Sequence, residues 1–315
     1  MKRLIPIMCF MNMLMGFSQE SKKAFIPDIV KQFPNVRDIA ISPDGNEMLF
    51  SAQSIMGNLS SVITIKKENG IWNKPQVTSF SGQYFDLEPF FSPDGLKIYF
   101  VSNRPIHKAS TTIKDFDIWY VERDDLNKNW SEPKNLGSPI NTLYDEFYPS
   151  IATNGNLYFT RDNTSLKNKD DIYFSEFKDS QYTEPMVLPN AINSEGYEYN
   201  AFIASDESFL IYGSYNRSGG FGSGDLYISF NSETGWTPAK NLGEHINSDK
   251  MDYCPFVDLK TSTLYFTSKM DNTITEFEKP LTIDELFEEL NKYDNGLSRL
   301  YHISIETLLK NKVTN

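Results

Sequence analysis

Short hydrophobic runs alternate with polar turns along most of this chain, and the same arrangement recurs five times. The clearest copy spans residues 86–100, where two strand-like runs flank the turn Ser92-Pro93-Asp94-Gly95. Proline presets the backbone of a turn, aspartate bonds to the local backbone, and glycine adopts the positive φ that closes a hairpin. Each copy is therefore predicted to begin with a β-hairpin.

The other four hairpins vary in their turns but keep their length. They are predicted at residues 38–50, 149–159, 202–212 and 255–266. The first repeats Ser-Pro-Asp-Gly, the third has Asn-Gly, the fourth has Ser-Asp-Glu, and the fifth has lost the Asp-Gly pair. The turn aspartates Asp44, Asp94 and Asp206 are accordingly interpreted as turn formers, because an aspartate side chain bonds to the backbone two residues on.

Two more strand-like segments follow each hairpin. A third strand is predicted at residues 62–65, 117–120, 171–174, 225–228 and 300–303. A fourth is predicted at the Trp-x-x-Pro segment and its variants, because proline lacks a ladder donor and suits an edge strand. These segments are residues 72–75, 130–133, 182–185 and 236–238.

Four strands per copy predict an all-β fold, a five-bladed β-propeller of four-stranded antiparallel blades, with six blades as the alternative. The fifth copy has no outer strand of its own, and Phe25–Val30 near the N-terminus resembles the missing one. We expect this N-terminal strand to close the ring, because the pairing satisfies two exposed edges at once.

An insertion at about residues 275–297 interrupts the last blade. Thr282-Ile283-Asp284-Glu285 matches a capping box, and Ile283, Leu286, Phe287 and Leu290 fall at helical spacing. One short amphipathic helix is predicted, packed on a face or the rim of the ring. Its apolar stripe either covers apolar surface of the ring or docks a partner.

The first eighteen residues have the pattern of a secretory signal peptide. Met1-Lys2-Arg3 is a basic start, Leu4–Met15 is apolar but short for a membrane span, and Gly16-Phe17-Ser18 offers small residues before a cleavage site. We therefore expect a signal peptide at residues 1–18 and a single propeller domain at residues 19–315, with a retained anchor as the alternative. The mature chain is then expected in the periplasm or outside the cell.

Charge and cysteine content limit the partners. Loss of Lys2 and Arg3 lowers the formal charge from −12 to −14, and Cys254 becomes the only thiol because Cys9 is removed as well. A single cysteine forms no internal disulfide, so stability has to come from packing and strand pairing. A polyanion of this kind is a poor nucleic-acid binder, because such proteins need basic patches.

The combined motifs resemble a known repeat. The Ser-Pro-Asp-Gly hairpins, the Asp-Ile-Tyr strands, the Trp-x-x-Pro segments and the crossovers at 139–141, 191–193 and 245–247 are similar to the WD40-like propeller repeat of TolB-type proteins. The resemblance covers roughly residues 24–309. It implies an exported propeller that binds partner proteins, and it names no ligand.

Four carboxylates occupy the same place in repeats two to five, three positions before the inner-strand proline or its equivalent. They are Asp86, Glu146, Glu198 and Asp252. Equivalent blades would place them at one height near a mouth of the central channel. Such a ring would raise some of their pKa values or attract cations.

Three interpretations of this ring remain open. The carboxylates could pair with backbone amides or with Arg104, Arg161 and Arg217, which follow the second strands. They could instead form a binding mouth for a cation or for a basic or hydroxyl-rich ligand. The third possibility is similar to five-bladed glycosidases, in which separated carboxylates act as acid and base.

Aromatic residues cluster in the segments that enter the inner strands. Among them, Tyr144, Tyr148, Tyr197 and Tyr253 are candidate ligand contacts, because rings with polar tips are frequent in interfaces and sugar sites. The same residues are also ordinary filler between blades.

Other chemistries find little support in the sequence. His107, His245 and His302 share no metal-ligand spacing, Cys254 has no neighbouring histidine, and the glycine-rich segment 218–224 lacks the lysine of a phosphate loop. That segment is a connector or a binding loop. Residues 124–129 lack the central glycine and closing glutamate of a calcium loop.

We expect a non-catalytic, exported propeller that binds a protein or a cell-envelope component through one channel mouth and its loops. The residues expected to contact the ligand are Asp86, Glu146, Glu198 and Asp252, with Tyr144, Tyr148, Tyr197 and Tyr253. The rival hypothesis is a carbohydrate-active propeller, for glycan binding or glycoside hydrolysis. We expect a monomer with no cofactor and no metal, no nucleic-acid partner, and no membrane span after signal cleavage.

Overall fold

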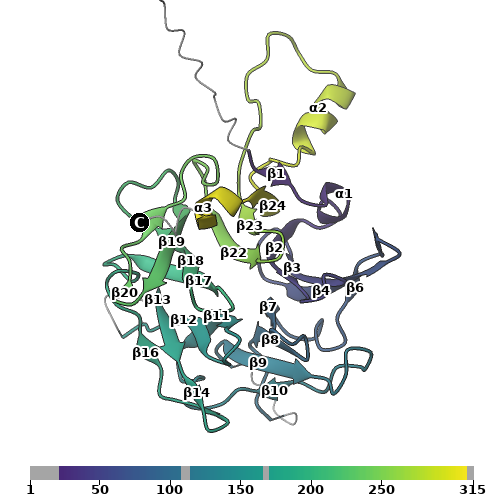
Figure 1. The fold of residues 1–315 in the computed structure, drawn as a ribbon. Helices are drawn as coiled ribbons and strands as arrows, with labels where there is room; N and C mark the ends of the chain where they lie inside the picture. Colours follow the sequence, from purple (N-terminus) through teal and green to yellow (C-terminus); the bar gives the residue numbers. More distant parts are fainter. Residues whose placement is uncertain (1–20, 108–113, 166–169, 311–315) are drawn as a thin grey trace, which may run out of the picture.

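Five antiparallel sheets surround a central axis in the computed structural model, which describes residues 21–107, 114–165 and 170–310 (Figure 1). The inner strands of the sheets lie close to the axis and the later strands lie progressively outward. The chain is a five-bladed β-propeller, so the predicted fold class is confirmed. The expected signal peptide at residues 1–18 lies outside the described residues.

The blades follow one another in chain order. Blade 1 contains β2 (Asn35–Ile41), β3 (Glu47–Gln53), β4 (Ser60–Glu68), β5 (Ile71–Trp72) and β6 (Gln76–Val77). Blade 2 contains β7 (Asp86–Phe91), β8 (Lys97–Ser102), β9 (Asp117–Glu122) and β10 (Lys134–Asn135). Blade 3 contains β11 (Asp145–Ile151), β12 (Leu157–Asp162), β13 (Asp170–Ser175), β14 (Phe177–Lys178), β15 (Gln181–Tyr182) and β16 (Met186–Val187). Blade 4 contains β17 (Tyr197–Ile203), β18 (Phe209–Tyr215), β19 (Gly224–Ser232), β20 (Gly235–Trp236) and β21 (Lys240–Asn241). Blade 5 contains β22 (Asp252–Asp258), β23 (Thr263–Ser268), β24 (Arg299–Ser304) and β1 (Lys23–Ala24).

The predicted turn chemistry is present in the inner hairpins. Gly45 and Gly95 adopt φ of 75° and 71° at the closing position. Asp94 accepts hydrogen bonds from the Leu96 amide and the Ser92 hydroxyl, at 2.9 and 2.5 Å. Asp206 accepts one from the Ser208 amide at 3.0 Å. The turn aspartates are therefore occupied by their own hairpins.

The outermost strands lie a few residues later than predicted. In blades 1, 3 and 4 the aromatic residue of the Trp-x-x-Pro segment belongs to a two-residue strand, β5, β15 or β20. Strands β5 and β20 pair with the end of the third strand of their blade, and β15 pairs with β14, which follows the third strand of blade 3. The strand that pairs with the body of the blade begins only after the proline, at β6, β10, β16 or β21. Because proline cannot donate to the ladder, it separates the two pairings.

Ring closure occurs near the predicted place but through different residues. Strand β1, at Lys23–Ala24, pairs with β24 and completes blade 5. The segment expected to form this strand, Phe25–Val30, instead contains helix α1 (Pro27–Val30). Pro27 stands at the start of the helix, where its fixed φ and missing amide proton are tolerated.

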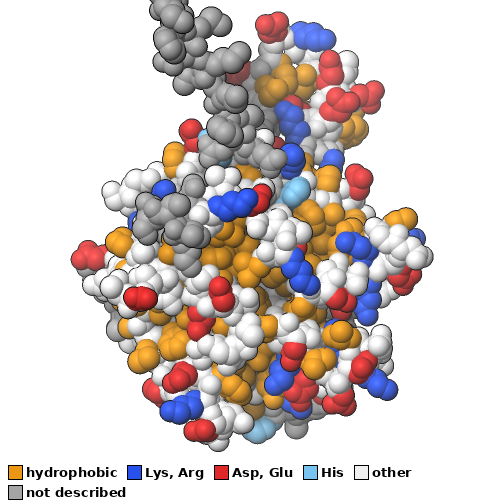
Figure 2. Space-filling view, viewed as in Figure 1, with side chains coloured by type: hydrophobic (Ala, Val, Ile, Leu, Met, Phe, Trp, Pro, Cys, Tyr) orange, Lys and Arg blue, Asp and Glu red, His pale blue; other side chains and the backbone are white. Residues whose placement is uncertain are grey.

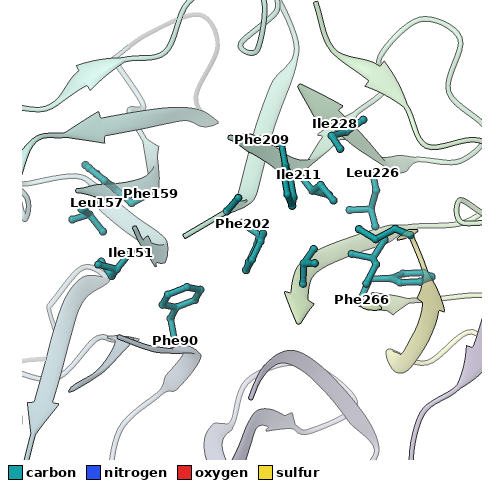
Figure 3. Packing of buried hydrophobic residues seen from close by; sticks show 14 of the residues in the cluster. Phe90, Ile151, Leu157, Phe159, Phe202, Phe209, Ile211, Leu226, Ile228 and Phe266 are labelled. Atoms are coloured by element: carbon teal, nitrogen blue, oxygen red, sulfur yellow. The ribbon is translucent and has the colours of Figure 1, made fainter. Parts of the chain in front are cut away.

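The channel is filled at the end where the inner hairpins turn. Phe90, Phe202 and Phe256, from blades 2, 4 and 5, have ring centroids 5.5 to 6.5 Å apart. Figure 3 shows Phe90 and Phe202 in the space between the inner strands, with Ile151 beside them. Hydrophobic packing therefore closes this end of the channel, and a cavity of about 350 Å³ lies outside the packing, between the hairpin turns.

The predicted helix in the last blade is present as α2 (Ile283–Leu290), with both hydrogen bonds of the Thr282–Glu285 capping box. None of its residues is buried, and Phe287 is 55% exposed, so the expectation that its stripe packs on the ring is wrong. The segment projects from the ring, and Figure 2 shows hydrophobic side chains at its surface among acidic ones. A third helix, α3 (Glu306–Lys310), ends the described chain.

Candidate binding site at the channel mouth

The four predicted carboxylates begin or nearly begin inner strands β7, β11, β17 and β22, and all are fully buried. Each accepts a hydrogen bond from the hydroxyl of a serine or threonine four or five residues earlier. The pairs are Ser81–Asp86 at 2.8 Å, Thr142–Glu146 at 2.6 Å, Ser194–Glu198 at 2.6 Å and Ser248–Asp252 at 2.8 Å. The donors belong to the connectors that enter each blade, so each carboxylate fastens a connector to its inner strand.

Three of the four also pair with the arginine that the sequence suggested. The N–O distances are 2.6 Å for Arg104–Asp86, 2.9 Å for Arg161–Glu146 and 3.6 Å for Arg217–Glu198. Each guanidinium also donates to a connector carbonyl, that of Phe80, Ile140 or Ile192. Burial raises the pKa of Glu146 to about 7, against the opposing effects of Thr142 and Arg161.

Blade 5 takes its cation from the other end of the chain. Lys22 Nζ donates to the carbonyl of Ile246 at 2.8 Å, the counterpart of Ile140 and Ile192 in the earlier connectors. Burial lowers the pKa of Lys22, while the charge of Asp252 opposes that shift. Burial likewise raises the pKa of Asp252. The segment that closes the ring thus supplies a cation to the connector of blade 5, as Arg104, Arg161 and Arg217 do for blades 2 to 4.

These bonds recur from blade to blade, and all four carboxylates that make them are fully buried. The connector asparagines Asn141, Asn193 and Asn247 add a second repeated contact, since each accepts from an amide of the preceding third strand. Ligand contact by Asp86, Glu146, Glu198 or Asp252 would require these connector bonds to break.

A different set of residues meets at the axis. The residue directly before the inner-strand proline, or its equivalent, has a positive φ of 50 to 61° in every blade. Each stands at an irregularity between the first and second strands of its blade. Non-glycine residues held in this conformation cluster at functional sites. They are Asp38, Glu88, Tyr148, Asn200 and Cys254.

Arg37 connects this axial cluster. Its guanidinium bonds to Asp38 at 2.6 Å and to Glu88 at 2.7 Å. Glu88 also accepts from the Asn200 side chain at 3.1 Å and from the Tyr148 amide at 2.7 Å. Cys254 Sγ donates to Asp38 at 2.7 Å. All five blades therefore meet in one buried network.

The electrostatics of the cluster follow from two carboxylates sharing one guanidinium. Burial raises the pKa of Glu88 to about 7, and Asp38 adds to that shift while Arg37 opposes it. Burial also raises the pKa of the Cys254 thiol well above its usual value, with Arg37 opposing and Asp38 adding to the shift. Cys254 is thus a protonated, fully buried thiol.

A cavity of about 510 Å³ lies above this cluster, at the mouth opposite the phenylalanine packing. Arg37, Glu88 and Asn200 are on its floor, and Tyr197, Tyr199, Tyr215 and Tyr253 are among its walls. Arg37 lies 5.1 Å from the centre of the Tyr253 ring. The volume falls within the range typical of small-ligand sites.

The four predicted tyrosines have different surroundings. Tyr197 and Tyr253 line the cavity, and Tyr197 is 37% exposed. Tyr148 is buried and donates its hydroxyl to the Pro255 carbonyl at 2.9 Å. Tyr144 bonds to Ser165 at 3.2 Å and does not line the cavity.

Sequence reasoning missed Arg37, Asp38 and Glu88. The sequence could have indicated this cluster through the position before the inner-strand proline or its equivalent. Asp38 and Asn200 occupy that position in blades 1 and 4, and both are residue types that tolerate a left-handed backbone. Asp162 was also missed; it lines the cavity, and its Oδ1 is buried without a hydrogen-bond partner in the described part of the chain.

Exposed hydrophobic residues lie in loops on the mouth face of the ring. The loop between β3 and β4 carries Ile55, Met56 and Leu59, with Met56 84% exposed. Leu143 precedes β11 and is 91% exposed, and Phe221 lies in the loop before β19. These loops join second to third strands, or one blade to the next, and such connections end on the mouth face.

Within residues 21–107, 114–165 and 170–310, no group of three or more His, Cys, Asp or Glu side chains is arranged to hold a metal ion. The three helices in the same ranges have 4, 8 and 5 residues, too short to cross a bilayer.

Comparison with known proteins gives the fold and no closer relationship. No family model matches the sequence, and no curated protein matches it significantly. An α-L-arabinofuranosidase from Lactobacillus brevis superposes with a TM-score of 0.50 and 13% identity, over 84% of this chain and 89% of that one.

TolB from Acinetobacter baumannii gives a TM-score of 0.46 at 15% identity over 75% of this chain, which spans about half (49%) of the TolB chain. The catalytic domain of a GH62 α-L-arabinofuranosidase from Coprinopsis cinerea gives 0.49 at 11% identity, over 86% of this chain and 91% of that one. At these identities the likenesses concern the fold alone.

Proposed function

We propose that this chain is an exported, non-catalytic propeller that binds a protein or another cell-envelope component through its channel mouth. The observation that carries the proposal is the cavity of about 510 Å³. Tyrosines form part of its wall, and the axial cluster around Arg37 forms its floor. Aromatic walls with a few convergent polar groups are typical of binding sites.

The surrounding loops favour a macromolecular partner. Met56 and Leu143 are almost fully exposed in loops on the mouth face, and a single small ligand in the cavity would leave them in water. A protein or envelope component covering the mouth would bury this apolar rim along with Tyr197 and Tyr215.

The polar groups of the cavity suit a partner that brings N–H or O–H donors. Asp162 Oδ1 is a buried acceptor without a partner among the described residues, and satisfying it would gain free energy. Asp162 also adds an acidic group to the wall, which favours a basic or hydroxyl-bearing segment.

The carbohydrate-active alternative has one observation in its favour, because Glu88 is a cavity carboxyl whose burial raises its pKa to about 7. Catalysis needs an acid and a base free to exchange protons with a substrate. Glu88 is held by Arg37, Asn200 and Tyr148, and the four repeated carboxylates are buried in connector bonds. This occupancy favours binding over hydrolysis.

The test is affinity capture from the native cell envelope with the chain from residue 19 onward. A Tyr197→Ala, Tyr215→Ala double variant should lose the captured component, which should then bind the purified wild-type chain directly. Met186→Ala, an exposed residue on outer strand β16, is the matched control and should capture normally.

Equal capture by the double variant and the control would refute the mouth as the binding surface. Glycoside turnover by the wild-type chain that Glu88→Gln abolishes would replace the proposal with the carbohydrate-active alternative.

A further inference from the structure

The seams between blades are filled by the aromatic residue of the Trp-x-x-Pro segment. Trp236 of blade 4 packs edge-on against Tyr158 of blade 3, with ring centroids 6.4 Å apart. Trp130 of blade 2 packs against the hydrophobic cluster that includes Leu49 of blade 1. Leu49, Tyr99 and Tyr158 occupy equivalent positions on the second strands, so the outer aromatic of one blade meets the second strand of the preceding blade.

The seam between blades 2 and 3 differs. Blade 3 has Tyr182 in place of tryptophan, and the side chains of Tyr99 and Tyr182 come together at this seam. Beside this pair lies a cavity of about 840 Å³, larger than the one at the channel mouth. It lies on the side of the molecule where the inner hairpins turn, since Pro93 and Thr153 are in its wall.

Aromatic rings and neutral polar groups dominate this cavity. Tyr99, Tyr120 and Tyr182 contribute rings and hydroxyl groups, and Ser138, Thr153 and Gln181 contribute hydroxyl and amide groups. Phe177, on the β14–β15 hairpin, adds an exposed apolar face next to Gly155.

The charged residues of the wall already have partners. Lys97 lies over the Tyr120 ring at 5.1 Å and pairs with Glu122 at 3.6 Å. Asp94 is occupied by the turn bonds to Ser92 and Leu96. The chain as a whole is strongly acidic, with a formal charge of −12. An anionic ligand would therefore be repelled, and nothing in the wall requires a cationic one.

We infer that this seam binds a neutral oligosaccharide. The apolar faces of sugar rings pack on aromatic side chains, while their hydroxyl groups exchange hydrogen bonds with neutral hydroxyl and amide groups. The cavity supplies both kinds of contact and has the volume of a small-ligand site. This site is separate from the channel mouth, so a test of it does not depend on the proposed function.

Isothermal titration calorimetry of the chain from residue 19 tests the inference. The probes are neutral tetrasaccharides: cellotetraose, xylotetraose, maltotetraose, mannotetraose and N-acetylated chitotetraose. At least one should bind with a dissociation constant of about 1 mM or lower. Tyr182→Trp introduces the residue found at this place in blades 1, 2 and 4, and should weaken that binding by about tenfold or more without lowering the melting temperature.

Thr153→Val provides a second variant, because it removes one cavity hydroxyl at nearly constant volume and should also weaken binding. Tyr197→Ala at the channel mouth is the control and should bind with wild-type affinity. Absence of binding by all five probes would overturn the inference. So would undiminished binding by both Tyr182→Trp and Thr153→Val, or a loss confined to Tyr197→Ala.

Discussion

Two acidic residues separated by a single position have different roles in blade 2. Asp86 holds the connector and Arg104, whereas Glu88 faces the axis and binds Arg37. The strand irregularity after Leu87 places Glu88 in a left-handed conformation and turns it inward. Position in the repeat, rather than residue type, therefore decides which carboxylate faces the axis.

Asp86→Asn is expected to destabilise the chain strongly. The substitution leaves the Arg104 guanidinium buried with no opposite charge, which costs about 3–5 kcal/mol. Urea unfolding measures the change in the free energy of unfolding. Glu195→Gln, an exposed acidic residue before β17, is the control and should change it by less than about 0.5 kcal/mol. A small loss for Asp86→Asn would argue against the connector role.

Glu88 should make the protein less stable as pH rises through the range in which it loses its proton. Burial raises its pKa from 4.5 in the unfolded chain to about 7 in the folded one. Between these values the folded state holds a proton that the unfolded state has released, so stability falls as pH rises from about 5 to about 7.

Urea unfolding across that pH range, with wild type and Glu88→Gln, measures the effect. The variant should show a shallower decline, and some decline should persist because burial also raises the pKa values of Glu146 and Asp171. An identical slope in the two proteins would contradict a raised Glu88 pKa.

At the scale of elements, helix α2 is specified locally and does not depend on packing. Its capping box forms as the sequence predicts, yet its apolar stripe contacts no core. Local hydrogen bonding at a helix start depends on four consecutive residues, whereas packing depends on where the whole insertion is directed.

Thr282→Ala should therefore loosen α2 alone. Loss of the cap costs about 1 kcal/mol, which corresponds to roughly fivefold faster amide hydrogen exchange in Ile283–Leu290. The melting temperature should stay unchanged, because no residue of α2 is buried. Thr275→Ala, an exposed substitution in the same insertion, is the matched control. A lowered melting temperature would indicate that α2 supports the ring.

At the scale of the whole molecule, stability depends on joining the two ends of the chain. Strand β1 completes the sheet of blade 5, and Lys22 beside it bonds to the connector carbonyl of Ile246. The arginines that serve the earlier blades reach their connectors from within the same blade. Closure thus combines strand pairing with a charge contact.

Lys22→Met should lower the free energy of unfolding by about 1.5–3 kcal/mol, because it removes a charged donor and leaves Asp252 buried without that neighbour. Lys23→Met, the adjacent exposed lysine of β1, is the control and should have little effect. Chemical denaturation of both variants measures the difference. Equal losses would mean that the charge contact adds nothing to strand pairing.

Much of the fold could be predicted because each repeat is specified by nearby residues. The Ser-Pro-Asp-Gly turns, the third strands and the α2 capping box all depend on contacts within a few positions. The strand prediction for Phe25–Val30 was wrong because Pro27 favours a helix start, and the outer strands lie after their prolines rather than before them.

The candidate site was predicted only in part. Tyr197 and Tyr253 line the mouth cavity as expected, whereas Arg37 and Glu88 were not recognised. Arg37 acquires its partners from blades 1, 2 and 5, which lie 51 to 217 positions away except for its neighbour Asp38. No local pattern in the sequence encodes such contacts.

Turn chemistry and strand alternation act over short distances, so the sequence is sufficient to specify five similar hairpin-based sheets. The side chains that meet at the axis and the seam that contains a cavity are set by contacts between blades. Those contacts arise when distant blades are brought together, and they depend on the bend of each inner strand and on the one seam aromatic that is a tyrosine.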